Sequence, residues 1–351
     1  MRALVTGATG FIGANVVREL LSRGSLVRAL VRKTSSLANL EGLDVDVTYG
    51  DVCDEDCLKP ALAGCDALFH VAASYSFWTP RPDQVYETNV RGTENILRAA
   101  AAAGIRRVVY TSTESTVGIP PGCTEGTEEL TAEPDTLMGH YKKSKHAAEQ
   151  LALRMAADGL PLVVVNPTTP IGPYDVRPTP TGRMVVDFLN GRMPAYVNTG
   201  LNIVHVRDVA VGHVLAFEKG RTGERYILGN RNMSYSDIMA TLAQVTGLRA
   251  PRLRIPIWLA LAAGYVDESV SGRLLGKPPR VPVAAVKTAR KHRYFDCRKA
   301  VADLGMPQTP VEEAFRSAVG WFVDHGYVSH ARLDIIRSHM AMHGAMAHQS
   351  G

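Results

Sequence analysis

The chain has 351 residues, of which 46% are hydrophobic and 21% charged, and its formal net charge is +5 at pH 7. At roughly 100–200 residues per domain, this length predicts two domains or one large α/β unit with an added lobe. The composition is typical of globular proteins and excludes wholesale disorder. The mild positive charge is spread over the chain, which favours an anionic small ligand over nucleic acid as the partner.

The five cysteines are odd in number and include no CxxC pair, which argues against a disulfide framework and for a reducing compartment. No His or Cys pair lies near them to complete a metal site. A functional-looking loop begins at Thr6, which leaves no room for a cleavable leader. The longest apolar stretch, residues 255–266, is shorter than the roughly 20 residues that span a bilayer. We therefore expect a cytoplasmic protein without metal, in which 255–266 is a buried helix or, alternatively, a membrane-surface helix.

The first half of the chain alternates strands with helices. Unbroken apolar runs such as Val163–Val165 are typical of parallel strands buried on both faces. The alternation predicts βαβ units and hence a Rossmann-type, doubly wound parallel sheet. Strands are expected at residues 1–6, 26–31, 45–49, 67–72, 107–112 and 162–166, and helices at 11–22, 86–103 and 140–157.

The pattern changes after residue 166. Residues 167–200 are rich in Pro, Gly and Thr and are expected to form loops, followed by a strand at 203–206 and a helix at 209–217. We expect a frayed helical tail at 329–351. The predicted domains are a Rossmann domain at 1–166 with a returning segment at about 201–218, and a smaller C-terminal substrate-binding lobe formed by 167–200 and 219–328.

Residues 6–13 form a glycine loop between the first strand and the first helix. In such a loop Gly7 permits a tight turn, Gly10 lets the backbone approach a pyrophosphate, and Gly13 lets helix and strand pack closely. The amides of the first helical turn and the helix dipole favour negative charge. The loop predicts a dinucleotide site with contacts from Gly7, Thr9, Gly10, Phe11, Ile12 and Gly13.

The end of the second strand indicates which dinucleotide binds. NAD sites usually place Asp or Glu there, but this chain has Arg32 and no acid. A guanidinium pairs with phosphate, so Arg32 favours NADP over NAD; the alternative interpretation is a solvated surface charge. Further contacts with the cofactor are expected at the ends of the third, fourth and fifth strands, from Asp51, Val52, Val71, Ala72, Ala73 and Thr111.

Tyr141 and Lys145 are four residues apart, so on a helix they share one face. A free phenol has a pKa near ~10, and a neighbouring ammonium together with a positive nicotinamide favours the phenolate. Tyr141 is then suited to moving a proton at a substrate hydroxyl or carbonyl, while Lys145 holds the nicotinamide ribose. Thr113, after the fifth strand, is the expected hydroxyl partner; strand-end hydrogen bonding is the alternative.

Together these motifs resemble the extended short-chain dehydrogenases/reductases of the NAD-dependent epimerase/dehydratase family. The shared motifs are TGxxGxxG (6–13), HVAA (70–73), NVxGT (89–93), TST (111–113), YxxxK (141–145), NPxxxxGP (166–173) and VRDVA (206–210). The resemblance covers residues 1 to about 328. It implies that Thr113, Tyr141 and Lys145 are catalytic, that Asn89 assists them, and that Pro167 and Thr168 lie beside the nicotinamide.

Two branches of the family compete. GHYKxSK (139–145), the run at 166–183, the run at 188–202 and RYILG (225–229) resemble the hopanoid-associated sugar epimerases, apart from His205, where that group has Asp. The segment around Arg32 instead resembles the corresponding segment of dihydroflavonol reductase-like proteins, which use NADPH. The first likeness implies an NAD(P)-dependent sugar epimerase/oxidoreductase linked to hopanoid biosynthesis, acting at a secondary carbinol or ketone with Tyr141 as acid and base. The alternatives are an NADPH-dependent carbonyl reductase and a non-catalytic dinucleotide-binding protein.

The substrate is expected to be a sugar, a sugar nucleotide or a hopanoid-linked sugar. Residues 174–202 should line its site above the carboxyl ends of the strands, with Arg183 and Arg192 clamping an anionic group and Asn166 adding a contact. Solvated surface arginines are the alternative. Apolar stretches at 255–266 and 278–286 would suit a polycyclic or lipid-like substrate instead. The basic residues at 287–299 favour a solvated face, with contact with anionic lipid as the alternative. Analogy with the family implies a homodimer.

Overall fold

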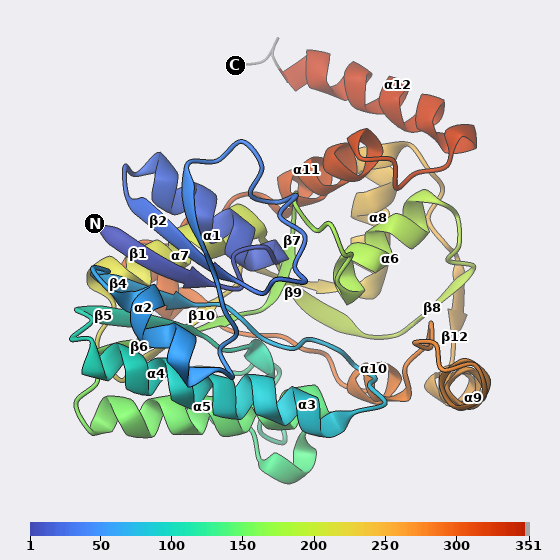
Figure 1. Cartoon of the computed structure of the whole chain (residues 1–351). Helices are drawn as coiled ribbons and strands as arrows, with labels where there is room; N and C mark the ends of the chain where they lie inside the picture. Colours follow the sequence, from blue (N-terminus) through green and yellow to red (C-terminus); the bar gives the residue numbers. More distant parts are fainter. Residues whose placement is uncertain (348–351) are drawn as a thin grey trace.

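Seven strands form one all-parallel sheet, in the order β3-β2-β1-β4-β5-β6-β10 (Figure 1). The structure is a computed structural model and describes residues 1–347. The order reverses between β1 and β4, which is where open α/β sheets bind ligands at the carboxyl ends of their strands. The strands are β1 (Arg2–Thr6), β2 (Leu26–Val31), β3 (Val45–Tyr49), β4 (Ala67–His70), β5 (Arg107–Thr111), β6 (Leu162–Pro167) and β10 (Arg225–Leu228).

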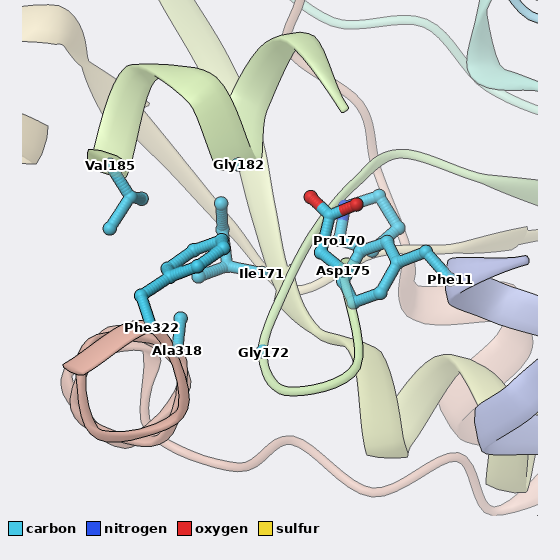
Figure 2. A pocket seen from close by; sticks show the side chains of 9 residues that line it. All are labelled: Phe11, Pro170, Ile171, Gly172, Asp175, Gly182, Val185, Ala318 and Phe322. Carbon is cyan, nitrogen blue, oxygen red and sulfur yellow. The ribbon is translucent and has the colours of Figure 1, made fainter. Parts of the chain in front are cut away.

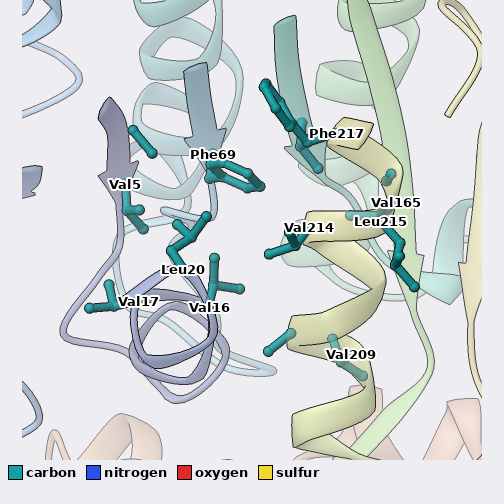
Figure 3. Close-up of a cluster of buried hydrophobic side chains, with 14 of the residues drawn as sticks. Val5, Val16, Val17, Leu20, Phe69, Val165, Val209, Val214, Leu215 and Phe217 are labelled. Atoms are coloured by element: carbon teal, nitrogen blue, oxygen red, sulfur yellow. The ribbon is translucent and has the colours of Figure 1, made fainter. Parts of the chain in front are cut away.

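Helices cover both faces of this sheet. On one face α1 (Phe11–Ser22) and α7 (Val206–Lys219) bury Leu20 and Val214 against Phe69 and Val165 (Figure 3). On the other face α2 (Leu58–Leu62), α4 (Gly92–Ala102) and α5 (His140–Ala157) pack on the opposite side chains of the same strands. Burying each large aliphatic side chain contributes about 1.5–3 kcal/mol, so the unbroken apolar strands are explained by burial on both sides.

The helix expected at 86–103 is divided. The structure has α3 (Pro82–Tyr86), a π-helical turn η2 (Glu87–Arg91) and then α4. A Cβ on Gly92 would lie 2.6 Å from Val52 Cγ2, so the absence of a side chain at Gly92 lets the start of α4 pass close to the β3 loop. The wide turn carries Asn89, which is 1% exposed. Such π turns are common at functional sites, and hydrophobic periodicity does not reveal them.

The expectation that residues 167–200 form loops is wrong in part. The segment holds β7 (Thr169–Ile171), α6 (Pro180–Leu189) and β8 (Ala195–Val197). Thr179 caps α6 by accepting a hydrogen bond from Gly182 N at 3.2 Å, and Pro180 occupies the first turn. The Thr-Pro pair is therefore a helix start, although the Pro and Gly content suggested a loop.

The substrate-binding lobe has its own core. β7 and β11 (Arg231–Ser234) flank β9 (Gly200–His205) in a three-stranded sheet, and β12 (Leu253–Ile255) pairs with β8. α6, α8 (Tyr235–Thr246) and α11 (Val311–Asp324) bury a second apolar cluster. The predicted domain division differs from this topology in two places. β10 was predicted to lie in the lobe but belongs to the large sheet, and β9 was predicted to return to the Rossmann domain but belongs to the three-stranded sheet. After β9, α7 crosses over the sheet and returns the chain parallel to β6.

The tail is ordered over most of its length. α12 (His330–Ala347) packs on α8, with Ile336 fully buried and His339 Nε2 2.8 Å from Gln244 O. Residues 330–342 are therefore docked rather than frayed, in contrast to the expectation. Residues 348–351 of the predicted tail lie outside the described residues.

An arm of helices projects beside the lobe. We call residues 249–295 the α9–α10 arm; it contains α9 (Ile257–Asp267), the π-helical η5 (Glu268–Leu274) and α10 (Val283–Thr288), seen at the lower right of Figure 1. The helix predicted at 255–266 is present, but only Ala260 and Gly264 of α9 are buried. The expectation of a buried helix is thus wrong. Within residues 1–347, no helix is long and apolar enough to cross a membrane.

Four short helical turns complete the fold: η1 (Glu55–Cys57), η3 (Glu114–Thr116), η4 (Pro134–Thr136) and η6 (Ala300–Leu304). η3 matters most for the site, because it begins directly after β5 at the carboxyl edge of the large sheet. Its N-cap is Thr113, whose hydroxyl oxygen accepts a hydrogen bond from Ser115 N at 3.3 Å. The cap fixes the direction of the Thr113 side chain relative to the strand end.

Candidate active site

The glycine loop has the geometry of a dinucleotide cradle. Gly7 has φ +68°, and a Cβ there would lie 2.7 Å from Ala72 N; a Cβ on Gly13 would overlap Gly7 O. A Cβ on Gly10 would meet only Gly7 O, at 3.3 Å, so the outer side of the loop is open for a ligand. No side chain caps α1, which leaves its first amides free for an anion. The loop therefore fits a pyrophosphate group.

The flanking loop residues are held by contacts that the sequence did not reveal. Asn39 Nδ2 donates to Thr9 O and to Tyr174 O, both at 3.0 Å, and so joins the glycine loop to the segment that enters the lobe. Ile12 packs against the apolar core under α1. The only signal in the sequence was that Asn39 is a short polar residue after the second strand. Nothing in its spacing identified Thr9 as its hydrogen-bond partner.

Phe11 faces the start of the lobe (Figure 2). Its ring lies beside Pro170 and Asp175, in a narrow void closed on the far side by Gly182 and Phe322. Asp175 is 2% exposed and accepts hydrogen bonds from the Thr179 amide and hydroxyl at 2.8–3.0 Å. Burial raises the pKa of Asp175 to about 6. The contact fixes the lobe against the cofactor loop.

Arg32, Asp51 and Val52 come to the same edge of the sheet as the glycine loop. Arg32 directly follows β2 and is exposed, and among the described residues its guanidinium has no salt bridge. Asp51 follows β3 and accepts a hydrogen bond from Cys53 N at 3.0 Å, while Val52 is buried. The strands pair in parallel with Val31 opposite Tyr49, so their ends are neighbours. An unpaired guanidinium at this edge is available to a phosphate.

A buried polar chain fixes the end of β4. Thr6 Oγ1 lies 2.7 Å from His70 Nδ1 and accepts from Ala72 N at 3.1 Å, and His70 Nε2 lies 3.0 Å from Thr93 Oγ1. Burial, and to a lesser degree the Lys145 charge, lowers the pKa of His70 to about 3. The imidazole is therefore neutral and acts as a link. Val71 and Ala72 stay half-buried and Ala73 exposed, at the edge predicted to meet the cofactor.

Tyr141 lies in the first turn of α5, where it meets the end of β5. Burial and then the Glu114 carboxylate raise the pKa of the Tyr141 phenol, while a hydrogen bond with the Thr113 side chain lowers it; the net direction is upward. The ring packs on Tyr75, with 4.6 Å between centroids. The structure thus brings Thr113 and Tyr141 together, and these surroundings of the chain itself favour the protonated phenol at neutral pH.

Lys145 is hydrogen-bonded to the end of β5. It is 2% exposed, and its Nζ donates to Tyr110 OH at 2.9 Å and to Thr111 O at 2.7 Å. Burial lowers the pKa of Lys145 to about 7, against the opposing effect of Glu149. The expected depression of the Tyr141 pKa by Lys145 is therefore absent in this arrangement. Thr111 contributes its carbonyl, because its hydroxyl lies 2.9 Å from His213 Nε2 on the α7 side of the sheet.

Asn89 joins three elements around Tyr141. Its amide oxygen accepts from Ser74 N at 2.7 Å, and its Nδ2 donates to Ser74 O at 3.1 Å and to Ser144 Oγ at 2.9 Å. Ser144 in turn donates to Tyr141 O at 2.8 Å. Asn89 therefore aligns the β4 loop with the first turn of α5. It acts on the phenol by positioning, since its own polar atoms are all engaged.

Asn166 belongs to a buried network, not to a ligand surface. It is 0% exposed, and its Nδ2 donates to Thr113 O, Thr116 Oγ1 and Glu149 Oε2 at 2.7–3.0 Å. Glu149 also pairs with Arg225, with 3.0 Å between Oε1 and Nη1. The predicted substrate contact from Asn166 is thus replaced by support for η3. Pro167 and Thr168 follow it, buried, with Thr168 Oγ1 bonded to Asn202 Oδ1 at 2.9 Å.

Charged residues beside the phenol were missed by the sequence analysis. Glu114 Oε2 accepts from Thr113 Oγ1 at 2.6 Å, and Arg293 Nε lies 3.9 Å from Glu114 Oε1. Lys142 is 7% exposed, and burial lowers its pKa to about 8. Arg293 comes from the α9–α10 arm, 179 positions after Glu114, and no sequence pattern could show that proximity. The signal for Glu114 was its place next to Thr113.

A cavity of about 290 Å³ opens next to the first turn of α5. Its described lining residues include no arginine. Arg183 and Arg192 are exposed, and Arg192 lies 3.9 Å from Asp187 in a surface pair, so the expected lining by residues 174–202 does not describe this cavity. The lining residues are Ser76, Phe77, Trp78, Thr79, Met138, Gly139, His140, Glu268, Val283, Ala284 and Lys287.

All five cysteines are free, and no group of three or more His, Cys, Asp or Glu residues in the described part of the chain could hold a metal. Hydroxyl, phenol, ammonium and carboxylate groups of Thr113, Tyr141, Lys145 and Glu114 lie at the carboxyl edge of the large sheet. These converge where the order of the sheet reverses, beside an open glycine loop, and that arrangement is suited to a proton transfer next to a bound dinucleotide.

The family model for the NAD dependent epimerase/dehydratase family matches residues 3–229. The chain belongs to this family. It is 48% identical over 328 residues to a Synechocystis protein named "Putative dihydroflavonol 4-reductase", covering 92% of this chain and 95% of that protein. It is 36% identical to sterol demethylase protein B of Methylococcus capsulatus, covering 93% of this chain and 100% of the relative.

A solved structure shares the fold over its whole length. It is described as a nucleoside-diphosphate-sugar epimerase from Pseudomonas aeruginosa, is 26% identical and superposes with a TM-score of 0.78, covering 94% of this chain and 99% of the other. The predicted Rossmann-type α/β fold and the predicted family membership are confirmed. The protein is an NAD(P)-dependent enzyme of the epimerase/dehydratase family, and its relatives include reductases as well as sugar epimerases.

Proposed function

We propose that this enzyme is an NADP(H)-dependent oxidoreductase that interconverts a ketone and a secondary alcohol on an apolar, ring-containing substrate. The observation that carries the proposal is the cavity at the first turn of α5, where the lining residue His140 directly precedes Tyr141. Its walls combine apolar side chains with a few polar ones, among them Glu268 and Lys287, and include no arginine among the described residues; the apolar ones are Phe77, Trp78, Met138 and Val283. A pocket of this kind binds apolar ring systems and orients them through few polar groups. The names of two sequence relatives, "Putative dihydroflavonol 4-reductase" and "Sterol demethylase protein B", agree with that substrate class.

The cofactor would be held by the glycine loop and by Arg32. Gly7, Gly10 and Gly13 shape the cradle, the free amides of α1 meet the pyrophosphate, and the unpaired Arg32 guanidinium meets a 2′-phosphate. Asp51, Val52 and Val71–Ala73 would lie along the adenosine, and Lys145, Pro167 and Thr168 near the nicotinamide end. When bound, the dinucleotide donates or accepts a hydride.

Tyr141 would carry the proton in this reaction. Because its phenol is held protonated, it is suited to donate a proton to the carbonyl oxygen of a ketone as that oxygen becomes an alcohol. Thr113 places its hydroxyl oxygen beside the phenol, and Asn89 fixes the turn through Ser144. Lys145 holds the carbonyl of Thr111 and so keeps the β5 end in place. In the reverse direction the same phenol would have to release its proton, which its raised pKa disfavours.

A second candidate is the sugar epimerase, free or linked to hopanoid biosynthesis, and the observation that favours it is the family match with the Pseudomonas structure. An epimerase regenerates its cofactor in every turnover and has no need to release it, whereas a reductase must exchange it. The first experiment is therefore to denature the purified protein, identify any released nucleotide and titrate the emptied protein with NADH and NADPH. Near-stoichiometric retained NAD would favour the epimerase, and an empty site that prefers NADPH would favour the reductase.

Turnover is then measured with a dihydroflavonol, a 3-ketosteroid and a UDP-sugar, for the wild type and for Tyr141→Phe. Loss of the general acid is expected to lower turnover by about 10²–10⁴-fold without changing NADPH affinity. Tyr86→Phe is the matched control. Tyr86 packs edge-on against His140, the residue before Tyr141, and the variant is expected to keep full activity. Activity retained in Tyr141→Phe, or activity on the UDP-sugar alone, would overturn the proposal.

A further inference from the structure

The outer face of the α9–α10 arm is an exposed apolar surface. α9 runs directly into η5, and positions 258, 262, 266, 270 and 274 recur every fourth residue along this helix, which places them on one side. Leu274 is 78% exposed and Trp258 66%. Single exposed apolar residues are ordinary, but a contiguous strip marks an interaction surface. The exposed large apolar residues of the arm are Leu253, Trp258, Leu259, Tyr265, Val266, Val270, Leu274, Leu275 and Val281.

The arm also concentrates positive charge. Residues 249–295 contain ten Lys or Arg and two acids, an excess larger than the +5 of the whole chain. Both acids are used internally: Asp267 accepts from Ser271 Oγ at 2.6 Å and Val281 N at 2.8 Å, and Glu268 accepts from Val283 N at 2.7 Å. In the described part of the arm, the exposed bases have no salt bridge; they are Arg249, Arg252, Arg254, Lys277, Arg280, Arg290 and Lys291.

The inner side of the same arm lines the cavity at the first turn of α5. Glu268 and Lys287 are two of its lining residues, and a Cβ on Gly272 would lie 3.1 Å from the Trp78 ring. The strip and the cavity are therefore two sides of one structural element. A ligand that reaches the cavity past the arm would pass the exposed apolar strip.

We propose that the outer face of the α9–α10 arm docks on an anionic lipid surface and so brings the cavity next to the lipid phase. Interfacial helices bury apolar and aromatic side chains at the acyl boundary, while flanking Lys and Arg extend to anionic headgroups. The arm has both components and no free carboxylate to oppose them. A second copy of the chain is a poorer occupant, because a two-fold contact would bring the same unpaired positive charges against each other. The proposal does not depend on the reaction, since docking is measured without substrate.

The test is sedimentation of the full chain with vesicles, using phosphatidylglycerol mixed with phosphatidylcholine and, separately, phosphatidylcholine alone. Binding to the anionic vesicles is expected to exceed binding to the neutral ones at least about tenfold and to fall with added salt. Trp258 should shift its fluorescence to shorter wavelength on binding, and Trp258→Phe should remove that shift.

Two double variants separate the contributions. Leu274→Ser/Leu275→Ser and Lys277→Glu/Arg280→Glu are each expected to weaken vesicle binding about tenfold or more. The matched controls are Leu26→Ser, which removes another exposed leucine, and Arg316→Glu, which reverses an exposed charge on α11; both should bind as the wild type does. All variants should keep their circular dichroism spectrum and NADPH affinity, since none touches the glycine loop.

Three outcomes would overturn the proposal. One is failure of the wild type to sediment with anionic vesicles. Another is equal loss of binding in the control variants, which would mean that the arm is not the contact. The third is a doubled mass in analytical ultracentrifugation that disappears in Leu274→Ser/Leu275→Ser without vesicle binding, which would assign the strip to a second copy of the chain.

Discussion

The sheet and the α9–α10 arm are both rich in apolar residues, yet they use them in opposite ways. In β4, β5 and β6 the apolar side chains are buried on both faces, whereas in α9 only Ala260 and Gly264 are buried. An apolar run therefore identifies an element that must be covered, but the covering partner is decided by topology. For the strands the partner is α1, α7 and the helices of the other face; α9 packs on α10 and leaves most of its apolar side chains exposed.

Charge separates the two regions in the same way. In the sheet half Arg225 is buried and paired with Glu149, which also accepts hydrogen bonds from Thr116 and Asn166 at 2.7 Å. In the arm the exposed bases have no salt bridge in the described residues. A buried charge is kept by its partner and destabilises the fold when the partner is removed, whereas an exposed charge contributes little to stability and is free for a ligand.

The largest effect is expected from breaking the buried pair. Arg225→Met leaves Glu149 uncompensated at 0% exposure and is expected to lower the free energy of unfolding by about 3–5 kcal/mol. Arg280→Met, which removes an exposed base of the arm, should change it by less than about 0.5 kcal/mol. Urea unfolding followed by circular dichroism measures both. Equal losses in the two variants would show that the contrast between the regions is mistaken.

The glycine loop should be the next most sensitive place. A Cβ at Gly13 would overlap Gly7 O, so Gly13→Ala must shift backbone and is expected to cost about 1–3 kcal/mol and to abolish tight NADPH binding. The control is Gly320→Ala in α11, where the nearest atom is Met340 Cε at 3.8 Å. That variant should gain up to about 1 kcal/mol from helix propensity. Thermal unfolding with and without NADPH distinguishes the two; unchanged NADPH binding in Gly13→Ala would count against the cradle.

Arg32 tests whether the cofactor edge, like the arm, offers an unpaired base to an anion. A hydrogen bond to a charged group contributes about 1.5–3 kcal/mol, so Arg32→Ala should weaken NADPH binding by roughly 10–100-fold while leaving NADH nearly unchanged. Lys291→Ala, a base of the arm, is the control and should affect neither. Quenching of intrinsic fluorescence gives both dissociation constants. An equal loss for the two nucleotides would exclude a contact with the 2′-phosphate.

The helices and strands of the sheet half could be predicted from the sequence, and the reason is physical. The helices at 11–22 and 140–157 and the strands at 26–31 and 45–49 have the bounds that were predicted, because burial against regular neighbours makes their periodicity clear. Local motifs also placed Tyr141 and Thr113 together. The cavity could not be predicted, because its walls come from three segments far apart in the chain. Nor could the environment of Tyr141, because Arg293 reaches Glu114 only through the folded arm.

Glu114 follows β5 of the sheet and lies beside Arg293 of the arm, and a variant at this position is expected to have the smallest effect. Its carboxylate raises the pKa of the Tyr141 phenol, while Arg293 of the arm lies 3.9 Å from it. Glu114→Gln removes a negative charge from beside the phenol, so the phenolate is less disfavoured and the pKa of Tyr141 falls. In the direction of reduction the phenol is the proton donor, and activity is lost as pH rises through its pKa. The alkaline limb of kcat/KM should therefore move to lower pH in Glu114→Gln.

In the reverse reaction the pH profile should move in the same direction, but there activity rises with pH instead of falling. Oxidation needs the phenolate, so it should begin at a lower pH in this variant. Glu313→Gln removes an exposed carboxylate of α11 and should leave both profiles in place. The measurement is kcat/KM from pH 6 to 11 in both directions, since two limbs that move together identify one titrating group. If the limbs moved to higher pH, or only one of them moved, the titrating group would not be Tyr141.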